Sequence, residues 1–197
     1  MGPQVQEFDE STLIQRAKTG DRVAQGQLYE HYVDAVYRYM LYRTGNHQIA
    51  EDLTAEVFSQ MLTAIKRYED RGLPFGVWLF RIARARLVDY WRLNKRQQDQ
   101  VINFSDDVEE FLIGTEAPDL RHEYADLIQA LGYLTAAERE IILLRFASGM
   151  NNQDIATVLH SNSNAVKSMM YRALRKLREI LSSQERFYEH AEGNDER

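Results

Sequence analysis

Helical spacing of apolar residues between Asp9 and Asn94 is the feature that most constrains the fold of this chain. Within this stretch, no run of alternating apolar and polar residues is flanked by turn residues, as a half-buried strand would be. Hydrophobic residues make up 44% of the chain and charged residues 27%, close to the averages of globular domains. We therefore expect a folded, all-α protein.

Capping residues and helix breakers place the helix ends in this first half. Asp9 and Asp21 can accept hydrogen bonds from the first turn of a helix, and Gly20 and Gly45 suit helix ends. The expected helices begin at Asp9, at Asp21, near His47 and near Pro74, and they end at Gly20, at Gly45, near Tyr68 and near Lys95.

The periodicity disappears between Gln97 and Leu120, where acidic residues, Gly114 and Pro118 appear. Such a stretch is typical of a solvated linker with little tendency to form a helix. We therefore expect two small helical domains joined by an acidic, flexible linker. The expected division is 1–96 for the first domain, 97–120 for the linker, 121–182 for the second domain and 183–197 for a polar, disordered tail.

Helical spacing resumes after the linker. Thr135 and Glu138 have the spacing of a capping box, which begins a helix, and Gly149 is expected to break that helix. The helices expected in this half cover 124–131, 135–148 and 152–159, and a last one follows a turn at 160–162 and ends near Leu181.

The net charge of −6 conceals two basic blocks. One lies between Arg81 and Arg96, where Asp89 is the single acid, and the other lies between Lys167 and Arg178, where there is no acid. Acidic residues gather instead in the linker. Local affinity for DNA is therefore compatible with an acidic chain.

Several classes of function are excluded by composition. The chain has no cysteine, which removes disulfides, thiolate metal sites and cysteine nucleophiles. Its five histidines are scattered, and it has no glycine-rich phosphate loop. Residues 1–7 lack the basic and apolar segments of a signal peptide, so we expect none here, and no apolar run reaches bilayer length. We expect a cytoplasmic protein that is not an enzyme, does not insert into membranes and uses no cofactor or metal.

The helix expected over 74–95 carries cations on one face. At 100° per residue these cations fall within about a third of the circumference, opposite an apolar face. The cationic face comprises Arg81, Arg84, Arg92, Lys95 and Arg96, and the apolar face comprises Phe75, Leu79, Ile82, Ala83, Tyr90 and Leu93. Arg86 projects into the apolar stripe, so we expect it to form an internal ion pair.

Trp78 and Phe80 lie beside the Glu69–Gly76 loop, where aromatic surface next to cations suits single-stranded DNA. The alternative is that both rings belong to the core.

The last two expected helices have the layout of a helix-turn-helix. Apolar contacts would hold the pair together through Ile155, Ala156, Leu159, Val166 and Met170. The exposed donors on the second helix would be Ser163, Asn164, Lys167, Ser168, Tyr171, Arg172 and Lys176. A helical hairpin with a solvated basic face is the alternative.

Two blocks of sequence, in this order, carry a resemblance. They read AEDLTAEVF at 50–58 with PFGVWLFRIA at 74–83, and LTAAERE at 134–140 with DIA at 154–156, AVKS at 165–168 and RALRKLR at 172–178. The first block resembles region two, and the second region four, of the extracytoplasmic-function (ECF) sigma factors of the sigma-70 family. The resemblance covers about Ser11 to Leu181, apart from the linker.

The resemblance implies a factor that directs RNA polymerase to promoters and assists strand opening. Binding to the core polymerase is then expected from Asp52, Leu53, Glu56, Val57 and Phe58. Capture of the melted minus-ten strand is expected from Arg71, Phe75, Trp78, Phe80, Arg81, Arg84, Arg92 and Lys95. The minus-thirty-five duplex would be read by Ser163, Asn164, Lys167, Ser168, Tyr171, Arg172 and Lys176. An anti-sigma factor is an expected further partner.

Four positions depart from the family pattern. Ala85 stands where an asparagine that touches the minus-ten strand is frequent, and His160 where a glycine is usual, so the turn must adopt a positive φ or another shape. Ser161 and Met169 replace an apolar residue and an arginine. Two alternatives remain, a helix-turn-helix regulator of duplex operators and a helical adaptor or inhibitor protein.

Overall fold

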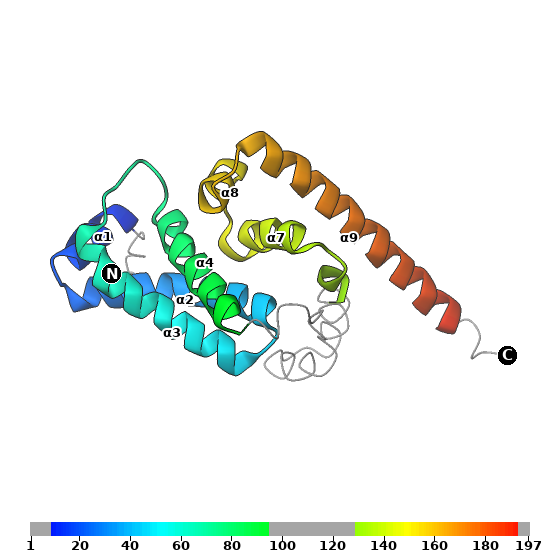
Figure 1. Cartoon of the computed structure of the whole chain (residues 1–197), viewed down its shortest axis with the longest axis horizontal. Coiled ribbons are helices and arrows are strands. Elements are labelled where there is room, and N and C mark those ends of the chain that lie inside the picture. The colour runs from blue at the N-terminus through cyan, green and yellow to red at the C-terminus, as the bar shows by residue number, and fades with distance from the viewer. Residues whose placement is uncertain (1–8, 95–128, 193–197) are drawn as a thin grey trace, which may run out of the picture.

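The computed structural model of the chain describes residues 9–94 and 129–192, with side chains up to Ser183. All the regular structure in these two stretches is helical, which confirms the all-α fold class (Figure 1). The expected linker lies outside the described residues, and so does most of the helix expected over 124–131. Residues 129–132, where the description resumes, are helical.

The first two helices begin at the acidic residues expected to cap them. α1 (Glu10–Lys18) follows Asp9, whose carboxylate accepts an amide hydrogen bond of the first turn. α2 (Arg22–Thr44) follows Asp21, whose carboxylate accepts two such bonds, at 2.9 and 3.2 Å. Gly45 then ends α2 with a φ of 65°, a conformation that glycine adopts at little cost.

The next helices differ slightly from the expected ones. α3 (His47–Ala64) passes into a 3₁₀ turn, η1 (Ile65–Arg67), so the α-helix itself ends before Tyr68. α4 (Phe75–Leu93) begins one position after Pro74, whose backbone is extended with a ψ of 141°, and it ends before Lys95. Leu93, expected on the apolar face, is 80% exposed because it is the last residue of its helix.

One core lies between these helices. α2 packs against α1 and α3, and α4 packs against both α2 and α3 (Figure 1). Gly76 allows the close approach of α4 to α2, since a Cβ there would lie 3.2 Å from the Tyr32 ring. The largest fully buried side chains of this core are Tyr39, Phe75, Phe80, Leu28, Met40, Met61, Ile65, Leu79, Leu87 and Val36.

After the short helical stretch at 129–132, the described part of the second unit forms α7 (Ala136–Ser148), α8 (Asn152–Leu159) and α9 (Ser163–Glu192). The capping box at the start of α7 is present: the Thr135 hydroxyl accepts a hydrogen bond from the Glu138 amide, and the Glu138 carboxylate accepts one from the Thr135 amide at 2.9 Å.

The last helix is longer than the sequence predicted. α9 continues through the expected end near Leu181 and through part of the expected tail, as far as Glu192. Glutamine, glutamate, arginine and alanine, which favour helices, dominate this extension, and the first glycine after the helix start is Gly193. In Figure 1, α9 runs away from the rest of the molecule.

The two units touch. α7 packs against α2, and α8 packs against α4 (Figure 1).

Candidate nucleic-acid interface

The loop before α4 holds its aromatic neighbour in place. The Asp70 carboxylate accepts a 2.9 Å hydrogen bond from the Gly72 amide, and Gly72 has a φ of 71°, which turns the chain toward the helix. Trp78, one turn into α4, packs its ring at 5.0 Å from Tyr68 and 5.1 Å from Phe75, measured between ring centroids. The Trp78 side chain is half-buried. It packs against the core and also lines a cavity.

This cavity has a volume of about 630 Å³ and is lined by both units. Trp78 lies at its wall together with four arginines, Arg67, Arg71, Arg81 and Arg84. Val158 and His160 of the second unit contribute to the same wall. The cavity therefore combines an aromatic surface with a concentration of positive charge.

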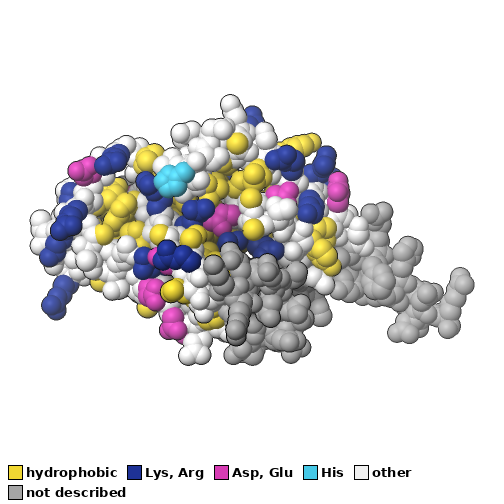
Figure 2. All heavy atoms as spheres, in the orientation of Figure 1, with side chains coloured by type: hydrophobic (Ala, Val, Ile, Leu, Met, Phe, Trp, Pro, Cys, Tyr) yellow, Lys and Arg dark blue, Asp and Glu magenta, His cyan; other side chains and the backbone are white. Residues whose placement is uncertain are grey.

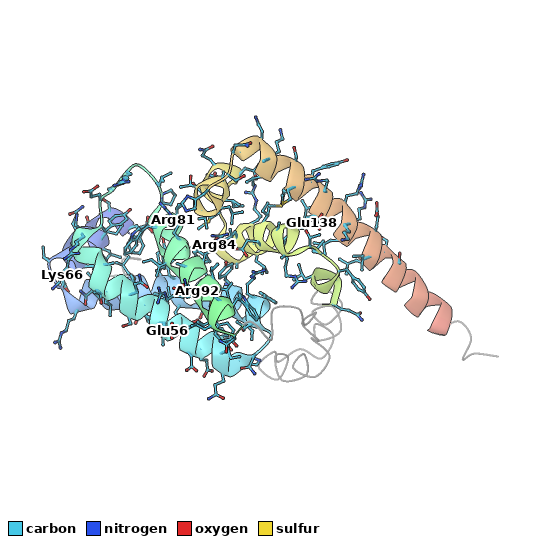
Figure 3. All side chains as sticks on the ribbon, in the orientation of Figure 1. Glu56, Lys66, Arg81, Arg84, Arg92 and Glu138 are labelled. Atoms are coloured by element: carbon cyan, nitrogen blue, oxygen red, sulfur yellow. The ribbon has the colours of Figure 1, made fainter. Side chains whose placement is uncertain are left out.

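The arginines differ in their partners. Arg81 is exposed and forms no ion pair with an acid in the part of the chain that the structure describes. Arg71 pairs with Glu69 at 3.1 Å, with both side chains more than 70% exposed, so this pair adds little stability. Figure 3 shows Arg81, Arg84 and Arg92 along α4, with Glu56 on the neighbouring α3.

Two of the aromatic rings expected to meet DNA are buried. Phe80 is fully buried, with its ring centroid 5.5 Å from that of Tyr39, and Phe75 is 1% exposed. Neither ring is accessible to a base in this structure, because both help to pack α4 onto α2. The alternative interpretation, in which the rings belong to the core, is thus correct for Phe80, whereas Trp78 keeps an accessible edge.

The remaining cations expected on or near the cationic face of α4 are placed as follows. Arg92 is exposed and pairs with Asp89 at 3.2 Å. Arg86 also pairs with Asp89, at 2.9 Å, so its expected internal ion pair is present and is formed within α4 itself. Lys95 and Arg96 lie outside the described residues.

The helix-turn-helix expected in the second unit is formed by α8 and α9. Its apolar contacts are present: Ile155, Ala156, Val166 and Met170 are buried, and Leu159 is half-buried. His160 stands where a glycine is usual, and it adopts a φ of 52°, the positive φ that this turn requires.

The start of α9 presents polar side chains. Asn164, Lys167, Ser168, Tyr171 and Arg172 are exposed, and Ser163 is half-buried. Lys176, expected in the same set, is half-buried and lies 3.8 Å from Glu138 of α7. Hydrogen bonds within the capping box, chiefly from the Thr135 amide, lower the pKa of Glu138, so its carboxylate is charged beside Lys176 at neutral pH.

Only two of the five α3 residues expected to bind a partner are exposed on the acidic face of this helix. Asp52 and Glu56 are exposed, but Leu53, Val57 and Phe58 are buried because they form the stripe of α3 that faces α2. The exposed pair lines a groove together with Arg86 of α4. Direct contact with a partner is therefore open to the acids and not to the apolar residues in this structure.

Figure 2 shows Lys and Arg side chains over the middle of one face of the molecule and along its edge. No cluster of potential metal ligands occurs among the described residues. None of the helices described here is long and apolar enough to span a bilayer.

Family models match both units. Sigma-70 region 2 matches residues 28–97, and Sigma-70, region 4 matches residues 124–177. The ECF RNA polymerase sigma factor ShbA of Streptomyces griseus is 30% identical over 185 residues, which cover 87% of this chain and 97% of ShbA. The chain belongs to the ECF RNA polymerase sigma factors.

Another relative and two solved structures are also similar to this sigma factor. ECF RNA polymerase sigma factor BldN of Streptomyces coelicolor is 35% identical over 86% of this chain, which spans 64% of BldN's length. The solved structure of CnrH with the cytosolic domain of CnrY is similar, with a TM-score of 0.67 at 25% identity over 88% of this chain and 97% of that one. RpoE of Bartonella quintana, solved with the anti-sigma factor NepR, shares the fold, with a TM-score of 0.60 at 24% identity over 80% and 96%.

The sigma factor thus directs RNA polymerase to promoters, and the family to which it belongs consists of proteins that are not catalytic enzymes. We refer below to α1–α4 as region two and to α7–α9 as region four.

Sequence reasoning missed two features of the site. Arg67 was overlooked because it precedes the loop in a turn with no clear periodicity, although it adjoins Lys66 in a basic pair. The contribution of His160 and Val158 to the cavity had no signal in the sequence, because it depends on how region four packs on α4.

Proposed function

We propose that this sigma factor holds the melted minus-ten strand in the cavity beside Trp78 and reads the minus-thirty-five duplex with the start of α9. The observation that carries this proposal is the cavity itself, in which one accessible indole is surrounded by Arg67, Arg71, Arg81 and Arg84. An aromatic platform beside a cationic track is the arrangement used to bind single-stranded nucleic acid.

The energetics support a role in strand opening. Unstacking a base costs a few kcal/mol, whereas stacking it on an aromatic side chain returns about 1–3 kcal/mol. Each phosphate that an arginine neutralises adds the favourable release of counterions. Arg67 and Arg81 are the strongest candidates for such a contact, since both are exposed and neither forms an ion pair with the described acids. Arg71, Arg84 and Arg92 would exchange a carboxylate partner for a phosphate.

We propose that Asn164 and Ser168 face base edges and that Lys167 and Arg172 bind phosphates. Amide and hydroxyl groups can pair with base edges in the major groove, and cations near the start of the helix can meet the backbone. Tyr171 is 69% exposed on the same part of α9 and adds a hydroxyl donor. Ser163 and Lys176 are the less accessible members of this proposed set.

We propose that the core polymerase binds the acidic face of α3 through Asp52 and Glu56. Both carboxylates are exposed, and Leu53, Val57 and Phe58 support them from the core. The same proposal keeps the domain division at 1–96, 97–120, 121–182 and 183–197, with helix α9 extending into the last part. We infer a cytoplasmic site of action and no catalytic role of its own.

An anti-sigma factor is a further proposed partner. CnrH, whose solved structure is similar to this one, was captured with the cytosolic domain of CnrY. We infer that an anti-sigma factor binds the present sigma factor.

Transcription in vitro tests the proposed function. The purified chain is mixed with core polymerase that lacks any initiation subunit, a library of genomic fragments is transcribed, and the 5′ ends of the transcripts are mapped. We expect start sites preceded by two shared sequence elements, which neither component alone produces. Absence of any transcript above that of core polymerase alone would refute the proposal.

A further inference from the structure

Glu140 is a buried carboxylate whose partners all come from region two. It lies in α7 of region four and is 7% exposed. Its Oε1 accepts a 2.6 Å hydrogen bond from the Tyr39 hydroxyl of α2. Its Oε2 lies 3.2 Å from Nε of Arg43, and its Oε1 lies 3.7 Å from Nε of Arg84. A buried charge is unfavourable unless it is paired, so these three residues of region two offset the cost of burying Glu140 where the two regions touch.

Region four also covers the cavity proposed for the melted strand. Val158 and His160, at the end of α8 and in the turn after it, line that cavity together with Trp78. α8 packs against α4, the helix that carries Arg81 and Arg84 (Figures 1 and 3). The helix-turn-helix thus lies against the surface that would bind minus-ten DNA.

This arrangement does not fit a promoter-bound factor. The names of the two elements place them about 25 base pairs apart, which at roughly 3.4 Å per base pair is about 85 Å of duplex. In the structure the side chains of Arg84 in region two and Glu140 in region four are 3.7 Å apart. The two regions must therefore separate before both can contact one promoter.

We propose that Glu140 closes the free sigma factor by occupying Arg84 in place of a DNA phosphate, so that region four blocks the minus-ten surface until the regions separate. A phosphate at Arg84 would approach a guanidinium that already faces the Glu140 carboxylate, and the repulsion between the two anions favours DNA binding to the form in which Glu140 has moved away. This inference rests on the proposed function, because it assigns Arg84 to the DNA surface. Tyr39 and Arg43 act as positioning residues, since they hold the carboxylate and are not themselves placed on the DNA.

The first measurement follows closure without DNA. The chain has no cysteine, so Lys66→Cys and Ser183→Cys allow specific attachment of a donor and an acceptor dye to the full-length protein. Both positions are exposed, one in each region. Glu140→Gln keeps the shape of the side chain and removes its charge. We expect single-molecule energy transfer to show about a tenfold increase in the ratio of open to closed molecules, the effect of losing a charge-assisted contact of about 1.4 kcal/mol.

Glu179→Gln is the matched control. It removes the same charge from region four, at a residue that is 69% exposed and pairs with Arg175 of the same helix. We expect its ratio of open to closed molecules to equal that of the unsubstituted chain. An equal ratio in Glu140→Gln and Glu179→Gln would overturn the proposal. Should Glu140→Gln lose helicity in circular dichroism, Tyr39→Phe, which removes one oxygen atom from the same cluster, provides the deciding ratio.

The second measurement adds DNA. A fluorescent single-stranded DNA of random sequence is titrated with the free chain and its variants. We expect Glu140→Gln to bind about tenfold more tightly than the control, in parallel with its opening. Opening without tighter binding would refute the competition between Glu140 and DNA. If energy transfer shows no opening while the assembled polymerase still initiates, the closure is refuted and the proposed function stands.

Discussion

The Tyr39 hydroxyl donates a 2.6 Å hydrogen bond to the carboxylate of Glu140, which follows it by 101 residues in the chain. Burial, followed by the charge of Glu140, raises the pKa of Tyr39 well above its ordinary value, and the nearby Arg43 and Arg84 act in the opposite direction. A proton held more tightly in the folded state stabilises that state fully below the unfolded pKa, and this stabilisation is lost as the pH rises above it.

The stability of the sigma factor is therefore expected to fall as the pH rises past about 10, where an unfolded tyrosine ionises. Tyr39→Phe should lose part of this dependence, and Tyr29→Phe, at a 45% exposed tyrosine, should retain it. Urea unfolding at a series of pH values from neutral to alkaline measures the effect. Identical slopes for Tyr39→Phe and the unsubstituted chain would contradict the assignment.

Trp78→Ala is expected to impair strand opening by the assembled polymerase about tenfold or more while leaving the closed complex largely intact, since stacking on the indole contributes about 1–3 kcal/mol per base. Permanganate reactivity of thymines reports opening, and a mobility shift of the closed complex reports binding. Trp91→Ala, at the other tryptophan of α4, outside the residues that line the cavity, is the control. Equal losses of binding and opening would count against the proposed role of Trp78.

Lys167→Ala is expected to weaken binding of the upstream duplex and to lower the slope of affinity against salt concentration by about one unit, because one phosphate contact is lost. Fluorescence anisotropy with the assembled polymerase at several salt concentrations gives both values. Lys66→Ala removes an exposed lysine from region two and should leave the upstream contact unchanged. An unchanged slope for Lys167→Ala would remove this lysine from the DNA surface.

The capping box of α7 gives a prediction about acid stability. Thr135→Ala should lower the free energy of unfolding by about 0.5–2 kcal/mol, as the loss of an N-cap does elsewhere. The pKa of Glu138 is lowered in the folded state, mainly by the Thr135 amide, so its contribution is present above the unfolded pKa and is lost as the pH falls. Glu138→Gln should therefore unfold with a weaker dependence on pH in the acid range. Chemical denaturation between neutral and acidic pH checks this, and an unchanged dependence would contradict it.

His160 occupies a left-handed conformation with a φ of 52°. His160→Gly should stabilise the helix-turn-helix by about 1 kcal/mol, since glycine adopts this conformation without the steric cost of a Cβ. His160→Ala removes the imidazole but keeps the Cβ, so it should not share the gain. Thermal unfolding of the two variants separates conformational relief from loss of the ring. A gain of similar size in both would contradict the conformational explanation.

The helix ends could be predicted from the sequence because their causes are local. Asp21 accepts hydrogen bonds from amides two and three residues later, and Thr135 and Glu138 satisfy each other within one turn. The length of α9 could not be predicted by the same reasoning, since a polar sequence of good helix formers is compatible with both a helix and a frayed tail.

Burial within a helix was harder to predict. Trp78 and Phe80 are two residues apart and chemically similar, but a 200° rotation separates them, so Phe80 faces Tyr39 in the core while Trp78 keeps an edge at the cavity. Contacts between distant segments had no signal at all. Arg84 was predicted on a cationic face, and its partner Glu140 can be identified only from the packing of region four on region two.

Photo-crosslinking shows directly whether α4 binds unpaired DNA while α9 binds the duplex upstream. Benzoylphenylalanine is placed at Ala85, which is exposed and lines the cavity, or at Ser168, which is exposed on α9. After irradiation of the open complex, position 85 is predicted to crosslink to the melted minus-ten strand and position 168 to the upstream duplex. Crosslinks from position 85 to duplex DNA alone, or to no DNA, would refute the binding of unpaired DNA by α4.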